Sequence, residues 1–365
     1  MNLNIKALKQ LFKNTNASYK YLLFYSLIQI IKNKTKSEEV SFKQIIISMY
    51  RVSWFITFQY QLKFSPTDQI QNLMKDIFNS TDQSIKLNNP TNTIIKKIDF
   101  ETRSLLENQI NYEKSEVLLR YVLHRLIRPF YPILKKIPES GSHGLFKNKD
   151  DIYNSLENFQ KFKPLYYIKE KEKKIILQGE WVKYILDHYE LLELWLVHEW
   201  AKYMNLYNPG IENLIGKLKY PDLKRESLSY NRNFWKKIIH KNNINCIFTN
   251  KKLENSDFDI DHYICWNYLG HDEHWNLLPI NKTINKKKSN KVPGDKFIKK
   301  FVELKRFSLE NLKSSDRYLE AHQNFVGSSI KDLNFNEKYT KKILNISNTA
   351  ILAGFDRWDF NGNAN

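Results

Sequence analysis

Cysteine is nearly absent from this chain, and its scarcity excludes a whole class of small extracellular domains. Only 2 of the 365 residues are cysteine. Disulfide-built domains need several cysteine pairs and an oxidising compartment, and two cysteines cannot supply such a framework. The composition therefore predicts a protein that works in the reducing cytoplasm.

Long apolar runs are also missing. The longest, residues 21–31, is too short to cross a bilayer, which takes about 20 apolar residues. The first residues, MNLNIKALKQLFKNTN, lack the apolar core and the small residues of a signal peptide. We therefore expect a soluble cytoplasmic protein without a membrane-spanning segment.

Sequence motifs of nucleotide-driven machines are missing as well. We find no Walker-type phosphate loop, no helicase motif and no internal repeat in the sequence. If the protein works beside an ATPase or a sensor, we expect that activity on another chain.

Acidic residues are too few to balance the basic ones. Lys and Arg together number 58 and Asp and Glu 39, so the formal net charge is +19 at pH 7. Such a charge suits a polyanionic partner such as nucleic acid. Genomic drift offers another explanation, because the chain is crowded with Lys, Asn and Ile, as an AT-rich genome would produce.

The most informative stretch is residues 259–293, which read DIDHYICWNYLGHDEHWNLLPINKTINKKKSNKVP. Two carboxylates and a histidine stand at the end of a short apolar run. Asn276 follows inside a second apolar run, and Asn285 comes nine residues later in a lysine-rich helical start. This clustering makes the stretch the first place to look for chemistry.

These residue types suit the hydrolysis of a phosphodiester, which needs an activated water and a cation on the phosphate. His262 is the natural base, because imidazole titrates near neutral pH. Asp261 offers a hard carboxylate oxygen suited to Mg²⁺ or Mn²⁺, and Asn285 offers a weaker amide oxygen. Neighbouring strand residues point to opposite faces, so Asp261 and His262 can serve one phosphate only where the strand ends.

The order DH, WN and N-x-x-K-S resembles the signature of HNH endonucleases, whose fold is also called ββα-metal. The resemblance implies a β-hairpin closed by a helix, with His262 as general base and Asp261 and Asn285 as ligands of Mg²⁺ or Mn²⁺. It also implies that Asn276 ties the hairpin loop together and that Lys288, one helical turn beyond Asn285, faces the phosphate. Four lysines are the expected nucleic-acid contacts: Lys286, Lys287, Lys288 and Lys291.

The sequence departs from the archetype in two ways. Asn285 stands where the archetype has histidine, which makes this an HNN variant. Many relatives hold a structural zinc with two Cys-x-x-Cys pairs, of which only Cys246 survives here. Because Cys265 cannot complete a four-ligand site, we expect no structural zinc. Nothing in the pattern assigns a role to His271 or His274, which we expect on the solvated surface.

The predicted fold is mainly α with a small α+β part, a helical N-terminal region followed by a C-terminal ββα-metal (HNH) nuclease domain. A length of 365 residues predicts two to three domains. We expect a helical N-terminal domain for recognition or partner binding (1–137), a connecting region with a β-hairpin and a long helix (138–230), the HNH nuclease domain (231–300), and a C-terminal helical segment that packs on the body (301–365).

Apolar periodicity predicts several individual elements. The aromatic group Trp54, Phe55 and Phe58 allows either a base-stacking platform or a core, and its helical spacing favours the core. The tail around residues 350–358 is apolar enough to dock on the body. The expected helices cover residues 18–31, 115–127, 180–207 and 295–312, and a β-hairpin is expected over 165–177.

The function implied by the resemblance is metal-dependent hydrolysis of DNA, with double-stranded DNA as the expected substrate and RNA still open. One active site per chain favours nicking, whereas a double-strand break would indicate a homodimer. By analogy with the family we expect a role in anti-phage defence or restriction. Two alternatives remain: an inactive module that only binds nucleic acid, and a nuclease subunit that is silent until a partner or signal releases it.

Overall fold

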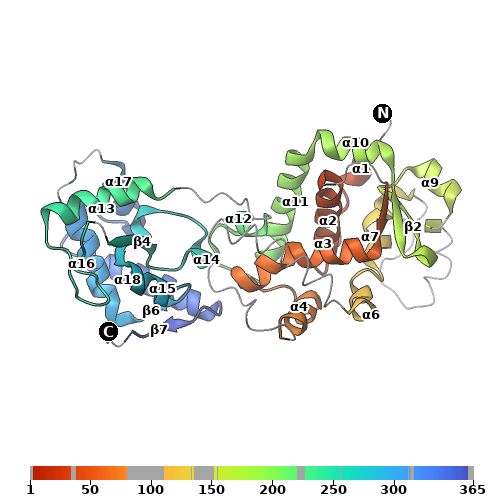
Figure 1. The fold of residues 1–365 in the computed structure, drawn as a ribbon. Coiled ribbons are helices and arrows are strands. Elements are labelled where there is room, and N and C mark those ends of the chain that lie inside the picture. The colour runs from red at the N-terminus through yellow and green to blue at the C-terminus, as the bar shows by residue number, and fades with distance from the viewer. Residues whose placement is uncertain are drawn as a thin grey trace. The chain divides into compact units, whose positions relative to one another are not determined.

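The computed structural model describes residues 3–33, 38–79, 111–132, 134, 152–153, 155–219, 227–255, 257–310, 312 and 316–360. The chain divides into two compact units (Figure 1). Unit 1 consists of Met1–Lys86, Ile95–Gly210 and Leu214–Pro221, and unit 2 of Leu87–Ile94, Ile211–Asn213 and Asp222–Asn365. Helices dominate both units and the sheets are small, which confirms the predicted fold class.

Unit 1 is built on helices whose apolar faces meet in one core. Its described helices are α1 (Ile5–Leu8), α2 (Tyr19–Asn33), α3 (Phe42–Trp54), α4 (Ile70–Asn79), α6 (Tyr112–Ser115), α7 (Val122–Ile127), α9 (Leu156–Phe162), α10 (Gly179–Asp187), α11 (Tyr189–Met204) and α12 (Leu214–Leu218). Shorter π or 3-10 turns cover Phe55–Gln59, Glu116–Leu118, Arg128–Phe130 and Glu170–Glu172. The predicted helix at residues 18–31 is confirmed as α2.

A small antiparallel sheet joins distant parts of unit 1. Strands β2 (Tyr166–Lys169) and β3 (Lys174–Leu177) form the predicted hairpin. Strand β1 (Glu39–Ser41) pairs with the other edge of β3, so the sheet order is β1-β3-β2. Ser41 then caps α3, because its hydroxyl accepts the backbone N–H of Gln44 while the Gln44 side chain accepts the N–H of Ser41.

The aromatic residues of unit 1 belong to its core. Trp54 and Phe55 are buried and Phe58 is half-buried, with the rings of Trp54 and Phe58 4.6 Å apart. Trp181 and Trp200 are also fully buried. This packing confirms the core interpretation of the aromatic group.

Two helices that the sequence predicts as continuous are interrupted in the structure. The helix expected at residues 115–127 is broken into α6, a 3-10 turn and α7. The helix expected at 180–207 is interrupted at His188, whose backbone leaves the helical region with φ −122° and ψ 24°. The His188 ring stacks on Tyr184 at 4.3 Å, and its Nδ1 lies 2.9 Å from the Tyr184 carbonyl oxygen. Trp195 on α11 is half-buried.

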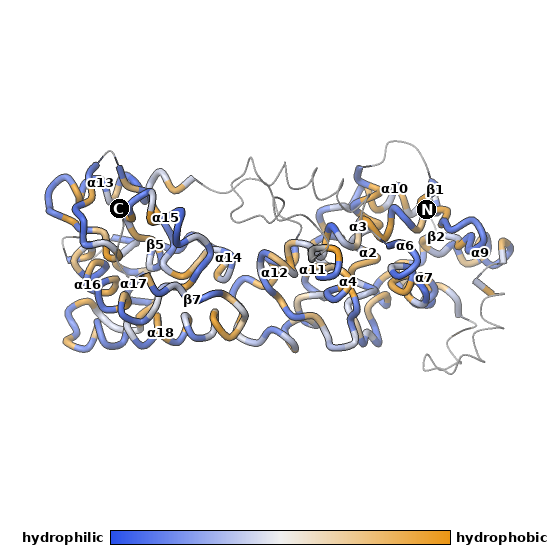
Figure 2. Tube along the Cα trace, turned by 60° about the horizontal axis from the view of Figure 1, so that its bottom comes forward, coloured by the Kyte–Doolittle hydropathy of each residue, from blue (hydrophilic) through white to orange (hydrophobic). Residues whose placement is uncertain are grey.

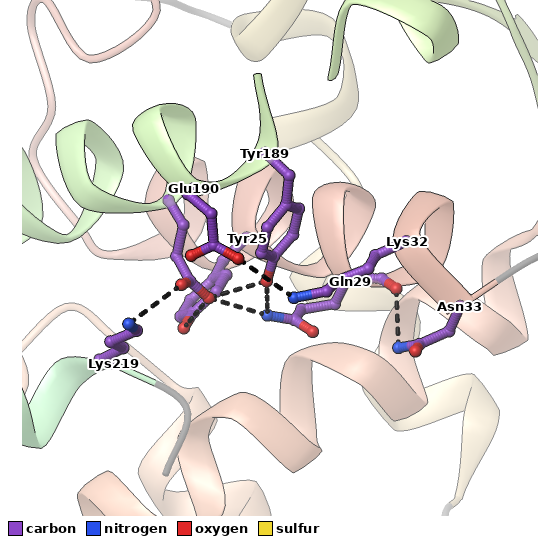
Figure 3. A network of polar contacts seen from close by, with 8 residues as sticks. Tyr25, Gln29, Lys32, Asn33, Tyr189, Glu190 and Lys219 are labelled. Atoms are coloured by element: carbon purple, nitrogen blue, oxygen red, sulfur yellow. Dashed lines mark hydrogen bonds and ion pairs between the residues drawn. The ribbon is translucent and has the colours of Figure 1, made fainter. Parts of the chain in front are cut away.

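A buried carboxylate anchors α11 to α2 (Figure 3). Glu193 Oε1 accepts hydrogen bonds from Tyr25 Oη at 3.0 Å, Tyr189 Oη at 2.8 Å and Gln29 Nε2 at 3.2 Å. Its other oxygen lies 3.6 Å from Lys219 Nζ, just beyond α12. A buried charge is tolerated only when it is paired and hydrogen-bonded, and this network satisfies both needs.

Unit 2 surrounds a two-stranded antiparallel sheet of β4 (Phe258–His262) and β5 (Leu277–Asn281). Its remaining described elements are α13 (Ser229–Lys241), α14 (Trp266–Leu269), α15 (Lys282–Lys288), β6 (Val292–Pro293), α16 (Ile298–Leu309), α17 (Arg317–Val326), α18 (Phe335–Leu352) and β7 (Arg357–Trp358), with 3-10 turns at His274–Asn276 and Asp295–Phe297. The 3-10 turn and α16 together confirm the helix expected at residues 295–312. Figure 2 shows α15 as a hydrophilic (blue) segment.

The C-terminal tail docks on unit 2, as predicted. Ala350, Phe355 and Trp358 belong to its buried apolar core. Strand β7 pairs in parallel with β6, and the Trp358 ring lies 5.0 Å from the Phe248 ring. Among the helices of the described residues, none has the length and apolar character needed to cross a membrane.

Candidate active site

The hairpin of β4 and β5 sets the direction of the candidate side chains. In its antiparallel register, His262 pairs with Leu277, Asp261 with Leu278 and Asp259 with Ile280. His262 is the last residue of β4, so the Asp261–His262 pair lies at the strand end, where the sequence predicts it. Alternation along β4 places Asp259 and Asp261 on one face and His262 on the other.

Asn276 closes the loop that connects the two strands. Its Oδ1 accepts the backbone N–H of Ile264 at 2.8 Å, and its Nδ2 donates to the Ile264 carbonyl at 2.7 Å. The Asn276 side chain is fully buried. Buried backbone groups need partners, so one amide here satisfies both polar groups of Ile264 and fixes the backbone just beyond His262.

His262 has an acidic partner that the sequence motif does not include. Its Nε2 lies 2.7 Å from Asp272 Oδ1. The His262 side chain is 9% exposed, whereas Asp272 is 26% exposed. The Asp272 carboxylate, in the loop between the strands, therefore fixes the orientation of the imidazole ring from one side.

Helix α15 carries two further candidates back to β4. Asn281 caps the helix by accepting the N–H groups of Thr283 at 3.0 Å and Ile284 at 3.3 Å. The next turn brings Asn285 to β4, where its Nδ2 donates to Asp259 Oδ2 at 3.3 Å. Asp259 also lies 3.8 Å from the guanidinium of Arg232 on α13. The structure thus brings a second carboxylate, from Asp259, to the expected site.

Lys288 lies in a different environment from the one that its sequence position suggests. We expected it to face the phosphate, but its side chain is completely buried. Its Nζ donates to the His262 carbonyl at 2.7 Å and lies 2.8 Å from Asp261 Oδ2. The inward direction follows from these two partners, because a buried ammonium requires a counter-charge and hydrogen-bond acceptors.

The other three expected nucleic-acid contacts remain at the surface. Lys286 and Lys287 are exposed, and Lys291 is half-buried. Lys286 and Lys287 belong to the hydrophilic α15, and Lys291 follows it. This helix packs next to the strand that carries Asp259 and Asp261. Their cations are therefore available to a phosphate backbone, which Lys288 is not.

The comparison with protein families matches this geometry. Residues 246–294, which span β4, β5 and α15, match the model of the family described as HNH endonuclease. The C-terminal unit carries an HNH endonuclease domain. Neither the search of curated proteins nor that of solved structures gives a match. The domain indicates a nuclease that acts on nucleic acid.

The donor atoms of the HNH domain suit a hard cation. Asp259 and Asp261 offer carboxylate oxygens from one face of β4, and Asn285 offers an amide oxygen because its nitrogen is the atom bonded to Asp259. All-oxygen sets of this kind fit Mg²⁺ or Mn²⁺ better than softer metals. Within the described residues no group of three or more His, Cys, Asp and Glu side chains is arranged to hold a metal.

The cysteines and histidines beside the HNH motif are buried or paired. Cys246 and Cys265 are both buried, and neither belongs to a disulfide. His271 Nε2 lies 2.8 Å from Glu212 Oε2, within hydrogen-bond distance. His274 is wrongly expected at the surface: it is 3% exposed and its ring stacks on Tyr318 at 3.8 Å.

A buried basic cluster surrounds His274. Desolvation lowers the pKa of His274 far below its usual range and lowers that of His322 to about 3. Burial also lowers the pKa of Lys305, whose Nζ donates to the carbonyls of His274 at 2.6 Å and Leu277 at 2.5 Å. These contacts support the backbone before β5 and involve none of the candidate catalytic side chains.

Proposed function

We propose that the HNH domain hydrolyses phosphodiester bonds in DNA with the help of Mg²⁺ or Mn²⁺. The observation that carries the proposal is the contact of Asn285 with Asp259, on the strand face that Asp261 shares, together with the His262 ring held by Asp272 at the end of the same strand. A base and an oxygen-donor set at one strand end are the two parts that metal-assisted hydrolysis requires.

His262 acts as the general base in this proposal. When Nε2 carries the proton and donates it to Asp272, Nδ1 is the ring nitrogen that can take a proton from water. The Asp272 carboxylate also stabilises the imidazolium that forms when the proton is transferred. Asp272 is therefore a positioning residue, because it acts on the reaction through His262.

Asp261 and Asn285 would hold the cation, and Asp259 lies close enough to Asn285 to contribute a third oxygen donor. A cation bound there would supply Lewis-acid chemistry to the phosphodiester. Lys288 keeps Asp261 in place and adds a fixed positive charge behind the carboxylate. Its contact with the His262 carbonyl links α15 directly to the strand end that carries the base.

DNA is the proposed substrate because the charge of the chain and the lysines of α15 favour a polyanion. The formal net charge is +19, and Lys286 and Lys287 are exposed next to the donor set. Their contacts with a phosphate backbone would be independent of base sequence and sensitive to salt. Anti-phage defence or restriction remains the proposed biological setting, on the analogy with HNH nucleases.

The substrate proposal is tested by incubating the full chain with supercoiled plasmid, linear duplex DNA, single-stranded DNA and RNA of matched length. Each reaction contains Mg²⁺, Mn²⁺ or EDTA. We expect cleavage of duplex DNA with either metal and none with EDTA. Cleavage of RNA but not of DNA would show that the substrate is RNA. Binding of nucleic acid without cleavage in either metal would show that the protein is a binding module and not a nuclease.

A further inference from the structure

Unit 1 contains a cavity of about 540 Å³. It lies between the turn that precedes α2, the first residues of α2 and the segment from the 3-10 turn Glu116–Leu118 to α7. Cavities of about 300–1,000 Å³ are the usual size for small-molecule ligands. Each described residue of its wall belongs to unit 1.

The turn that forms one side of the cavity is held in place by several contacts. Asn16 offers its carbonyl to Tyr203 Oη at 2.9 Å and to Thr67 Oγ1 at 3.4 Å. Thr15 Oγ1 donates to the Phe12 carbonyl at 2.7 Å. Asn14 takes a left-handed backbone conformation with φ 56°, which asparagine tolerates better than most residues. The polar side of the cavity is thus preformed and has no need to fold around a ligand.

Among the described residues, the lining of the cavity contains cations and no acidic side chain. Lys20 is 6% exposed, and its Nζ donates to the Lys13 carbonyl at 3.1 Å. Arg125 is exposed at the rim, and no carboxylate of the described residues forms an ion pair with it. Asp68 lies nearby, where it accepts the backbone N–H of Ser18, but it is not among the described lining residues. The potential inside the cavity therefore favours an anion.

Two tyrosines supply flat apolar surface beside these cations. The Arg125 guanidinium lies 5.4 Å from the centre of the Tyr121 ring, so cation and ring form one continuous wall. Tyr19 also lines the cavity, and its hydroxyl accepts the backbone N–H of Gln69 at 2.6 Å. Burial raises the pKa of Tyr19, so its ring stays neutral at physiological pH. Aromatic faces of this kind stack on planar rings such as nucleobases.

We propose that this cavity binds a mononucleotide, with Arg125 on the phosphate and Tyr121 against the base. The size of the cavity suits a small molecule better than a polynucleotide. A simple anion would use the cations but would leave the tyrosines and much of the volume without a role. Asn14, Thr15 and Asn16 provide amide and hydroxyl groups for the sugar or the base edge. This binding goes beyond the proposed nuclease function and does not depend on it.

The test is calorimetric titration of the full chain with 5′-AMP, 5′-GMP and inorganic phosphate in EDTA. Without divalent metal, a nucleotide cannot be held through a cation at the HNH site. We expect at least one nucleotide to bind and inorganic phosphate to bind at least about tenfold more weakly, because phosphate cannot stack on Tyr121. Equal binding of phosphate and nucleotide, or no binding of either nucleotide at millimolar concentration, would overturn the proposal.

Matched variants locate the binding. Arg125→Met removes the rim cation, and Arg120→Met is the control because Arg120 is exposed, close in sequence and outside the lining. Tyr121→Leu removes the ring while keeping an apolar side chain. We expect Arg125→Met and Tyr121→Leu each to weaken nucleotide binding about tenfold and Arg120→Met to leave it unchanged, with thermal unfolding checked for each. Nucleotide binding that survives both cavity substitutions lies elsewhere and contradicts the proposal.

Discussion

The imidazole of His262 and the carboxylate of Asp272 are 2.7 Å apart, although they stand ten positions apart in the sequence. The contact fixes one ring nitrogen and leaves the other for a water molecule. The contact orients the ring of the proposed base before substrate binds. Substitution of Asp272 therefore tests the proposed mechanism, as substitution of a motif residue does.

Replacing Asp272 with Asn should slow cleavage without weakening DNA binding. The amide cannot stabilise the imidazolium, so we expect the rate constant at saturating DNA to fall by about 10- to 100-fold. Glu273→Gln, at an exposed neighbouring position, is the control. Single-turnover cleavage gives the rate and a filter-binding assay in EDTA gives the Kd. A changed Kd with an unchanged rate would assign Asp272 to DNA contact instead.

Replacing Asn285 with Ala should raise the metal requirement. The variant loses an oxygen donor beside Asp259 and Asp261, so we expect the Mg²⁺ concentration for half-maximal cleavage to rise by about tenfold or more. Asn290→Ala removes a nearby asparagine that the donor set does not include. A metal titration of plasmid cleavage compares the two, and an identical Mg²⁺ requirement would remove Asn285 from the metal site.

Replacing Lys288 with Met should destabilise unit 2. The change leaves Asp261, which is 15% exposed, without its counter-charge, and breaking a buried ion pair from one side costs about 3 kcal/mol or more. Urea unfolding measures the free energy, with Lys287→Met as the exposed control. Adding Asp261→Leu to Lys288→Met should recover much of the loss, because no unpaired charge then remains. A stable single variant would show that the ion pair contributes little.

His322 should make the protein sensitive to acid. Its pKa is about 3 in the folded protein and 6.5 in an exposed chain, so only the unfolded state takes up a proton as the pH falls below 6.5. Each pH unit below that point therefore lowers the free energy of unfolding by about 1.4 kcal/mol, and His274 acts in the same direction. When the pH falls from 7 to 5, the free energy of unfolding should drop by about 2 kcal/mol less in His322→Leu than in the wild type.

Urea unfolding at the two pH values measures that difference. His198→Leu, at an exposed position, should retain the full wild-type dependence. If the free energy of unfolding of His322→Leu falls with pH as steeply as that of the wild type, His322 is protonated in the folded protein too.

The ββα arrangement of the HNH domain is readable from the sequence, because the spacing of Asp261, His262, Asn276 and Asn285 is typical of a hairpin followed by a helix. Regular elements convert sequence spacing into direction, and β4, β5 and α15 pack together as the motif predicts. Asp272 is not readable in this way, since it lies in a loop and loop positions carry no periodicity. Asp259 is partly readable: it shares a strand face with Asp261, but only the packing of α15 brings Asn285 to it.

The features that the sequence did not predict also have physical explanations. Lysine is almost always exposed, so no sequence pattern predicts that Lys288 is buried against Asp261. The break at His188 contains neither proline nor glycine, the residues that usually end a helix. The cavity of unit 1 is assembled from segments about a hundred residues apart, around Asn16 and Tyr121, and only tertiary packing joins them.

The most direct test of the central claim is plasmid cleavage by His262→Ala with Mg²⁺ or Mn²⁺. His240→Ala is the control, because His240 is exposed on α13 and outside the candidate site. We predict that wild type and His240→Ala nick or linearise the plasmid, that EDTA abolishes the reaction, and that His262→Ala loses it while still binding DNA. Cleavage by His262→Ala at the wild-type rate would contradict the assignment of His262 as the base.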